Sequence, residues 1–253
     1  MDMTSAEFAA VERIAGRLDG GVLLVCDHAC NAFPAAYGAL GLPAETLARH
    51  IAYDIGAAWL TRRLAARLGA PALLSTFSRL LIDPNRGADD PTLVMRYSDG
   101  AIVPGNARID AAEIARRTDA YWRPYRDAVL ASAEAMGAAG REPAIVSIHS
   151  FTPFWRGFAR PWKVGVLYDG EERLARAVLR GLADEGLAAH EIGDNEPYRG
   201  GLPGDTIDAA AVARGRRNAL IEVRQDLIAT QPAAEHWADR LARLLDRALA
   251  IDS

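Results

Sequence analysis

Hydrophobic and polar positions alternate along the chain in blocks that predict strands and helices in turn. Short continuous apolar runs, typical of strands buried on both faces, cover residues 21–27, 72–77, 144–149, 163–168, 187–192 and 218–223, with a shorter β-like run at 80–82. Apolar residues spaced three and four apart predict helices over 43–69, 110–140, 171–186 and 232–250. Strands that alternate with helices favour an α/β protein, a three-layer α/β/α sandwich around a mixed, partly parallel sheet.

Three parts of this pattern carry more specific expectations. The chain before residue 21 is expected to be helical, and the helix over 110–140 is expected to be interrupted near Pro124. The segment 43–69 opens with Pro43 and closes on Gly69, which predicts one long helix with His50 and Asp54 on one face. That pair could support a site, supply metal ligands or form only a helix-surface hydrogen bond.

Composition narrows the class of protein. The 253 residues are 50% hydrophobic and 25% charged, which is ordinary for a globular chain, and nothing splits it, so one domain over 1–253 is expected. A formal charge of −4 gives no basic footprint, so nucleic acid is not an expected partner. Apolar stretches fall short of the ~20 residues that a membrane span needs. The chain is therefore expected to act in the cytoplasm on a small molecule.

Two histidines close predicted strands. His28 lies in "CDHACN" directly after the first strand, and His149 ends "AIVSIH". Because ligands of α/β proteins bind at the carboxyl ends of strands, both are candidates for a metal site, with Asn31 three residues after His28. Two histidines and a carboxylate suit a catalytic zinc that keeps an open position for water. The alternative is that each histidine makes structural hydrogen bonds.

The stretch "FSRLLIDPNRG" brings Arg79, Asp83, Asn85 and Arg86 into one strand and its following loop. The planar guanidinium matches a carboxylate in two parallel hydrogen bonds, so these arginines suggest recognition of an acidic small molecule. An internal salt bridge of Asp83 with either arginine is the competing interpretation.

A carboxylate interrupts the last predicted strand, "NALIEVRQDL", at Glu222. Burying an ionised carboxylate is costly unless it is paired or used, and such groups tend to have raised pKa values suited to a general base. Glu222 is therefore a candidate base, although a buried network of Glu222 with Arg224 remains an alternative.

These clusters, in this order, resemble a known family. The stretches "VCDHACN", "HIAYDIGAAWL", "FSRLLIDPNRG", "SIHSFTP", "KVGVLYD", "DNEPY" and "LIEVRQDLI" look like the N-formylglutamate amidohydrolase family, from about Leu23 to the C-terminal helix. More distantly, the order resembles the zinc carboxypeptidases. The resemblance implies the fold of zinc-dependent exopeptidases and one zinc ion.

It also implies residue roles. His28 and His149 would be zinc ligands with Asn31 at the third position, and Glu222 would activate water. Substrate-binding roles fall to Asn85, Arg86 and Arg224, and Arg79 would support the substrate carboxylate or the developing oxyanion. The expected reaction is N-formyl-L-glutamate plus water to formate plus L-glutamate, the last step of one route of histidine breakdown.

The sequence differs in two places from the families that it resembles, and these differences leave alternatives open. Asn31 stands where the carboxypeptidases have a glutamate, so the third ligand could instead be Asp27, Asp54 or a water held by Asn31. Ala209 and Ala210 stand where relatives have an Arg-His pair, which opens the substrate to question. The alternative functions are an amidase for another N-acyl amino acid or peptide, a non-catalytic binding protein for an acidic metabolite, or purely structural polar clusters.

Overall fold

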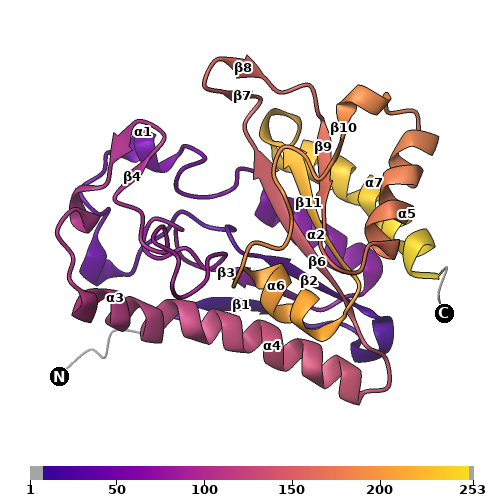
Figure 1. Cartoon of the computed structure of the whole chain (residues 1–253), viewed down its shortest axis with the longest axis horizontal. Coiled ribbons are helices and arrows are strands. Elements are labelled where there is room, and N and C mark those ends of the chain that lie inside the picture. The colour runs from indigo at the N-terminus through magenta and orange to yellow at the C-terminus, as the bar shows by residue number, and fades with distance from the viewer. Residues whose placement is uncertain (1–7, 251–253) are drawn as a thin grey trace.

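The computed structural model describes residues 8–250. A seven-stranded sheet with the order β1-β3-β2-β6-β11-β9-β10 runs through the molecule (Figure 1). Its strands are β1 (Val11–Ile14), β2 (Val22–Cys26), β3 (Ala72–Ser75), β6 (Ala144–Phe151), β9 (Val164–Leu167), β10 (Ile192–Asp194) and β11 (Asn218–Arg224). Strands β3, β2, β6 and β11 are parallel, whereas β1 is antiparallel to β3 and β9 is antiparallel to β11. The prediction of a mixed, partly parallel sheet is confirmed.

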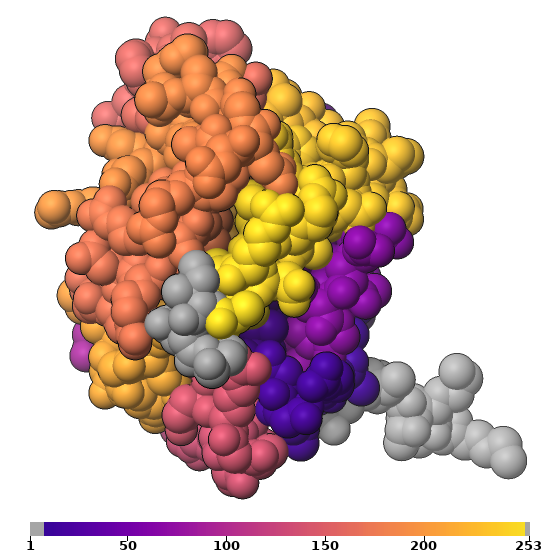
Figure 2. Space-filling view, turned by 90° about the vertical axis from the view of Figure 1, so that its right-hand side faces the viewer, coloured from indigo at the N-terminus to yellow at the C-terminus, as the bar shows by residue number. Residues whose placement is uncertain are grey.

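Helices cover both faces of the sheet, which confirms the three-layer arrangement. Along β2, Leu24 packs into a core with α2 (Ala57–Leu68), α5 (Arg173–Asp184) and α7 (Gln231–Ala250). Leu23 points to the other face, where it packs with α4 (Arg123–Ala138) and α6 (Thr206–Ala210). This alternation is the two-residue period of a strand buried on both faces. Figure 2 shows α7 on the outside, between α5 and α2.

Smaller elements gather near the carboxyl ends of the parallel strands. The hairpin of β7 (Phe154–Trp155) and β8 (Phe158–Ala159) directly follows β6. A second hairpin, β4 (Tyr97–Ser98) and β5 (Ala101–Ile102), lies with α1 (Ala44–Leu47) over a separate small core (Figure 1). These two hairpins and α1 extend the structure beyond the carboxyl ends of the parallel strands.

The prediction of one long helix over 43–69 is wrong for the middle of this segment. After α1 the chain forms turns from residue 48 to 56, and α2 begins only at Ala57. The break has a tertiary cause: Gly56 adopts φ +83° and lies so close to Ile228 that a Cβ there would be 2.1 Å from its carbonyl oxygen. In the break, the Asp54 amide donates to the His28 carbonyl oxygen at 2.9 Å. The interruption therefore brings Asp54 beside His28.

Four other predicted elements differ from the structure. In the described part of the chain before residue 21, strand β1 replaces the expected helix, while residues 1–7 lie outside the described residues. Residues 80–82 form a buried turn, and β10 starts at Ile192. The helix near Pro124 is continuous, because α3 (Ala111–Arg117) passes through a π-helical turn into α4, whose first turn accepts the proline.

Two further expectations concern the whole chain. Within residues 8–250, the helices are all too short or too polar to span a membrane. The prediction of one domain over 1–253 reaches beyond the described residues and stays a prediction.

Candidate metal centre and active site

A cavity of about 590 Å³ opens at the carboxyl ends of β2, β6 and β11. This is where α/β sheets bind their ligands, and the volume lies in the range of small-molecule sites. Eight side chains that the sequence analysis singled out are among the described residues that line it: His28, His50, Asp54, Arg79, Asn85, Arg86, His149 and Glu222. Segments far apart in the chain thus meet at one site.

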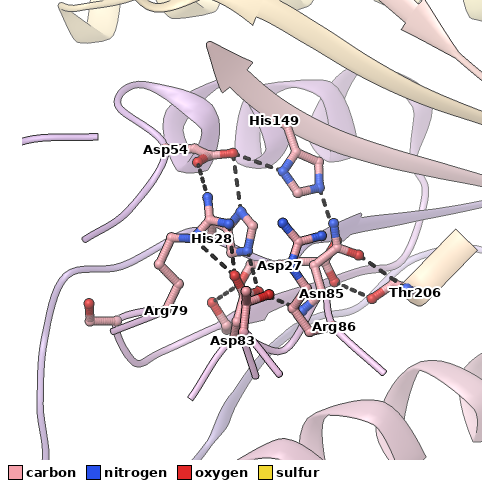
Figure 3. A network of polar contacts seen from close by, with 12 residues as sticks. Asp27, His28, Asp54, Arg79, Asp83, Asn85, Arg86, His149 and Thr206 are labelled. Carbon is pink, nitrogen blue, oxygen red and sulfur yellow. Dashed lines mark hydrogen bonds and ion pairs between the residues drawn. The ribbon is translucent and has the colours of Figure 1, made fainter. Parts of the chain in front are cut away.

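Three buried side chains form a compact set of possible metal ligands. His28, Asp54 and His149 each offer one ligand atom, and these atoms lie within 4.8 Å of one another. Asp54 Oδ2 is 2.8 Å from His149 Nδ1 and 3.4 Å from His28 Nδ1. Of the alternatives for the third position, Asp54 is the one that accompanies both histidines (Figure 3).

The far nitrogen of each histidine meets a buried carboxylate. His28 Nε2 is 2.7 Å from Asp83 Oδ1, and His149 Nε2 is 3.1 Å from Asp27 Oδ2. Metal-binding histidines commonly donate their other ring N–H to a carboxylate, which orients the ring and raises the basicity of the ligating nitrogen. The two rings are therefore held with their Nδ1 atoms toward Asp54.

Asp27 is itself fixed by hydroxyl groups from two elements. Ser147 Oγ on β6 donates to Asp27 Oδ2 at 2.9 Å. Thr206 Oγ1, at the start of α6, donates to Asp27 Oδ1 at 2.6 Å (Figure 3). The Asp27 carboxylate is fully buried. Asp27 is thus held where it can accept a hydrogen bond from His149 Nε2.

The donor set fits a divalent cation. His28 Nδ1 is buried and, apart from its 3.4 Å contact with Asp54 Oδ2, has no polar partner among residues 8–250, so this ring nitrogen can take another ligand. Four buried carboxylates, those of Asp27, Asp54, Asp83 and Glu222, surround the two histidines. Histidine nitrogens with a carboxylate oxygen are the ligands that zinc takes in catalytic sites.

The carboxylates next to the histidines are held in their ionised form. Burial raises the pKa of Asp54, but the charges of His28 and His149 and their hydrogen bonds outweigh burial and lower it. At Asp83 burial is outweighed by Arg79 and then His28, so its pKa lies well below the ordinary value. Asp54 and Asp83 therefore stay ionised over the whole neutral pH range, and as anions they can orient the two histidines.

Glu222 has the opposite character. It lies on β11 directly opposite His149 in the parallel pairing with β6, and its Oε2 is buried without a hydrogen-bond partner in the described chain. Burial, helped by the negative charge of Asp54, raises the pKa of Glu222 to about 7 although His149 opposes the shift. A carboxyl group with such a pKa can take up and release a proton near neutral pH.

The arginine loop borders the same cavity. Arg79 donates through Nε and Nη2 to Asp83 Oδ2 at 3.1 and 2.7 Å, so the salt bridge considered as the alternative is present. Arg79 still lines the cavity, with Nη1 3.6 Å from Asp54 Oδ1. Asn85 Oδ1 accepts the Thr206 amide at 3.1 Å, and Arg86 Nε is buried with no partner among the described residues. Arg86 thus has donor capacity left for a ligand.

Two of the predicted site residues point elsewhere. Asn31 donates its amide to the Leu47 carbonyl oxygen at 2.9 Å and is not among the described residues that line the cavity, so Asp54 replaces it beside the histidines. Arg224 pairs with Asp226 at 2.8 Å and also stays outside the lining. Both corrections have the same cause: nearby backbone and acidic partners hold these side chains.

The two alanines that stand where relatives have an Arg-His pair also lie outside the cavity. Ala209 and Ala210 are buried against the core beneath α6, outside the described lining. Among cavity residues that sequence reasoning passed over, Trp155 follows β6, while Tyr198, Arg199 and Asp205 come from the loop before α6. The motif "DNEPY" that contains Tyr198 was the available signal.

Fold and cavity together define an α/β protein with a candidate divalent-metal centre beside a buried carboxyl group, as in metal-assisted hydrolases. The sequence model of the N-formylglutamate amidohydrolases matches residues 20–229. The chain belongs to this family, as its motifs predict, and it is a hydrolase of amide bonds.

Two solved structures share the fold of this chain. A gene product from Agrobacterium tumefaciens is 38% identical over 98% of both chains, with a TM-score of 0.90. The fold is shared with N-formylglutamate amidohydrolase from Ralstonia eutropha JMP134, which is 22% identical over 95% of this chain and 99% of that chain, with a TM-score of 0.70. Comparison with curated protein sequences gave no match.

Proposed function

We propose that this amidohydrolase is metal-dependent and cleaves N-formyl-L-glutamate to formate and L-glutamate. The observation that carries the proposal is the buried Glu222, with a pKa of about 7, beside the His28, Asp54 and His149 group in one cavity. The family match supports the formyl substrate. We extend the proposal to a cytoplasmic location and to the last step of one route of histidine breakdown.

His28, Asp54 and His149 would hold the ion, with zinc as the first candidate because the set combines imidazole with carboxylate. A bound divalent ion supplies Lewis-acid polarisation of the substrate carbonyl and acidifies the attacking water. Asp83 and Asp27 keep both imidazole rings oriented for this task.

Glu222 would move the proton. It accepts a proton as the water oxygen bonds to the formyl carbon, and it donates that proton to the amide nitrogen as the C–N bond breaks. Formate leaves with the water oxygen, and the amino group of glutamate leaves with the proton. The pKa of about 7 belongs to the metal-free protein, and a nearby cation would lower it, which favours the carboxylate form that accepts the first proton.

Asn85, Arg86 and Arg79 would position the substrate. The unpartnered Arg86 Nε and the neighbouring Asn85 amide present donors for a carboxylate at the cavity wall. Arg79, fixed by Asp83 and close to Asp54, places a positive charge where negative charge develops on the carbonyl oxygen.

One observation favours a second candidate, an amidase for N-acyl amino acids with a larger acyl group. The cavity of about 590 Å³ is spacious for a formyl amino acid, and Phe151, Trp155 and Leu202 add apolar wall. Apolar lining contributes binding energy to an acyl group that has carbon surface to bury.

The decisive test is formate release from N-formyl-L-glutamate by zinc-loaded protein. It is run beside a chelated sample and the variants Glu222→Gln and Glu134→Gln, the second replacing an exposed carboxylate on α4. We expect release that is lost on chelation and in Glu222→Gln but kept in Glu134→Gln. No release by folded, zinc-loaded protein would refute the formylglutamate assignment, and turnover of longer N-acyl glutamates would then support the second candidate.

A further inference from the structure

One of the charged side chains that line the cavity has no charged partner among the described residues. Three arginines border it: Arg79, Arg86 and Arg199. Arg79 is paired with Asp83 at 2.7 Å and lies near Asp54. Arg199 makes no hydrogen bond or ion pair with any residue from 8 to 250, although acidic side chains neutralise most arginines of this protein.

The loop that carries Arg199 is held on both sides. Asn195 Oδ1 accepts the amides of Tyr168 at 3.0 Å and Gly200 at 3.2 Å. Tyr198 Oη accepts a hydrogen bond from the buried Arg160 at 3.0 Å. Gly200 packs so closely that a Cβ would lie 2.5 Å from the Tyr168 nitrogen. The backbone is thus fixed, while the Arg199 side chain is exposed and has no polar partner in the described part of the chain.

We propose that Arg199 is a specificity-determining residue that binds the side-chain carboxylate of an N-acyl dicarboxylic amino acid. The inference rests on the proposed function and deepens it. A dicarboxylic substrate needs two cationic partners, and the cavity offers two arginines with free donor capacity, Arg86 in the wall and Arg199 at the rim.

The assignment of the two carboxylates follows from the shape of the substrate. The α-carboxylate shares a carbon with the amide nitrogen, so it must stay near the reacting carbonyl and Glu222. Arg86 is close enough to Asp83 for its charge to lower that pKa, which locates it beside the candidate metal centre. The side-chain carboxylate lies at the far end of the molecule, where the exposed Arg199 borders the cavity.

The test compares N-formyl-L-glutamate with N-formyl-L-glutamine, which has the same length but a neutral end. Wild type, Arg199→Ala and Arg199→Lys are measured beside Arg180→Ala, which removes an exposed arginine from α5, outside the described cavity lining. We expect Arg199→Ala to lower kcat/KM for the glutamate substrate about tenfold, chiefly through KM, and to leave the glutamine substrate unchanged.

Arg199→Lys should restore part of the preference, and Arg180→Ala should keep it. Equal losses on both substrates, no loss, or the same loss in Arg180→Ala would overturn the inference. Wild type that releases formate from neither compound would refute the proposed function instead. Calorimetric binding of the two compounds to zinc-loaded Glu222→Gln, with and without Arg199→Ala, then decides the inference alone: loss of a preference for the acidic ligand supports it, and equal binding of both ligands overturns it.

Discussion

Replacing Glu222 by Gln should abolish activity and at the same time stabilise the metal-free protein above neutral pH. The carboxyl group is buried beside Asp54, and its Oε2 has no hydrogen-bond partner in the described chain. Ionising it inside the fold is therefore unfavourable. Glutamine has nearly the same shape and never ionises, so it removes this cost together with the proton-transfer group.

The magnitude follows from the pKa. Burial raises the pKa of Glu222 from an ordinary 4.5 to about 7, and each pKa unit corresponds to about 1.4 kcal/mol. Below pH 4.5 the group is protonated in both the folded and the unfolded state, so Glu222 imposes no cost there. As the pH rises to 7, the unfolded state releases this proton while the folded state keeps it, and about 3 kcal/mol of folding stability is lost. The glutamine variant does not lose it.

Thermal melts in the presence of a chelator, from pH 5 to pH 8, measure this difference. The advantage of Glu222→Gln should grow with pH and reach about 6–12 °C in Tm near pH 8, whereas Glu134→Gln should track the wild type. Saturating zinc should shrink the advantage, because a nearby cation favours the Glu222 carboxylate. A glutamine variant that is no more stable than wild type at pH 8 without metal would refute the reasoning.

Three other results are expected. Asp83→Asn, which leaves an acceptor oxygen for His28 Nε2 but removes its negative charge, should weaken zinc binding about 10–100-fold in a chelator-competition assay, while the exposed Asp119→Asn leaves affinity unchanged. Gly56→Ala should cost more than about 2 kcal/mol in urea unfolding, since its φ is +83° and its Cβ would meet the Ile228 carbonyl; unchanged stability would contradict this, and Gly20→Ala, with nothing nearer than 3.6 Å, is the control. Removing the metal should lower Tm by an amount that rises with the zinc concentration of the reference sample, and a concentration-independent Tm would argue against a folded-state zinc site.

Much of the site was accessible from residue type and from strand ends. His149 and Glu222 interrupt apolar runs, and the structure pairs them across β6 and β11 at the same height. Because the parallel strands share one carboxyl edge, residues that end separate runs meet there. The spacing of His28 and Asn31 was a weaker signal: the chain from residue 29 to 34 is not helical, so a separation of three does not place both side chains on one face.

Asp54 shows what local pattern cannot supply. The apolar spacing of residues 43–69 is satisfied by a single helix, and that prediction hides Asp54 on a helix surface. The real break depends on contacts with residues far along the chain, the Gly56 approach to Ile228 and the Asp54 amide bond to His28. Helical periodicity reports only neighbours within a few positions.

The sequence by itself determined the class of fold, the family and several of the residues near the sheet edge, among them His28, His149, Glu222 and Arg86. These follow from hydrophobic period, from the desolvation cost of burying charge and from the motifs. Only the tertiary structure decided which carboxylate joins the two histidines, that Asn31 and Arg224 are occupied elsewhere, and that Arg199 borders the cavity without a partner among residues 8–250. Each of these depends on distances between residues separated along the chain, and such distances are set by packing rather than by local pattern.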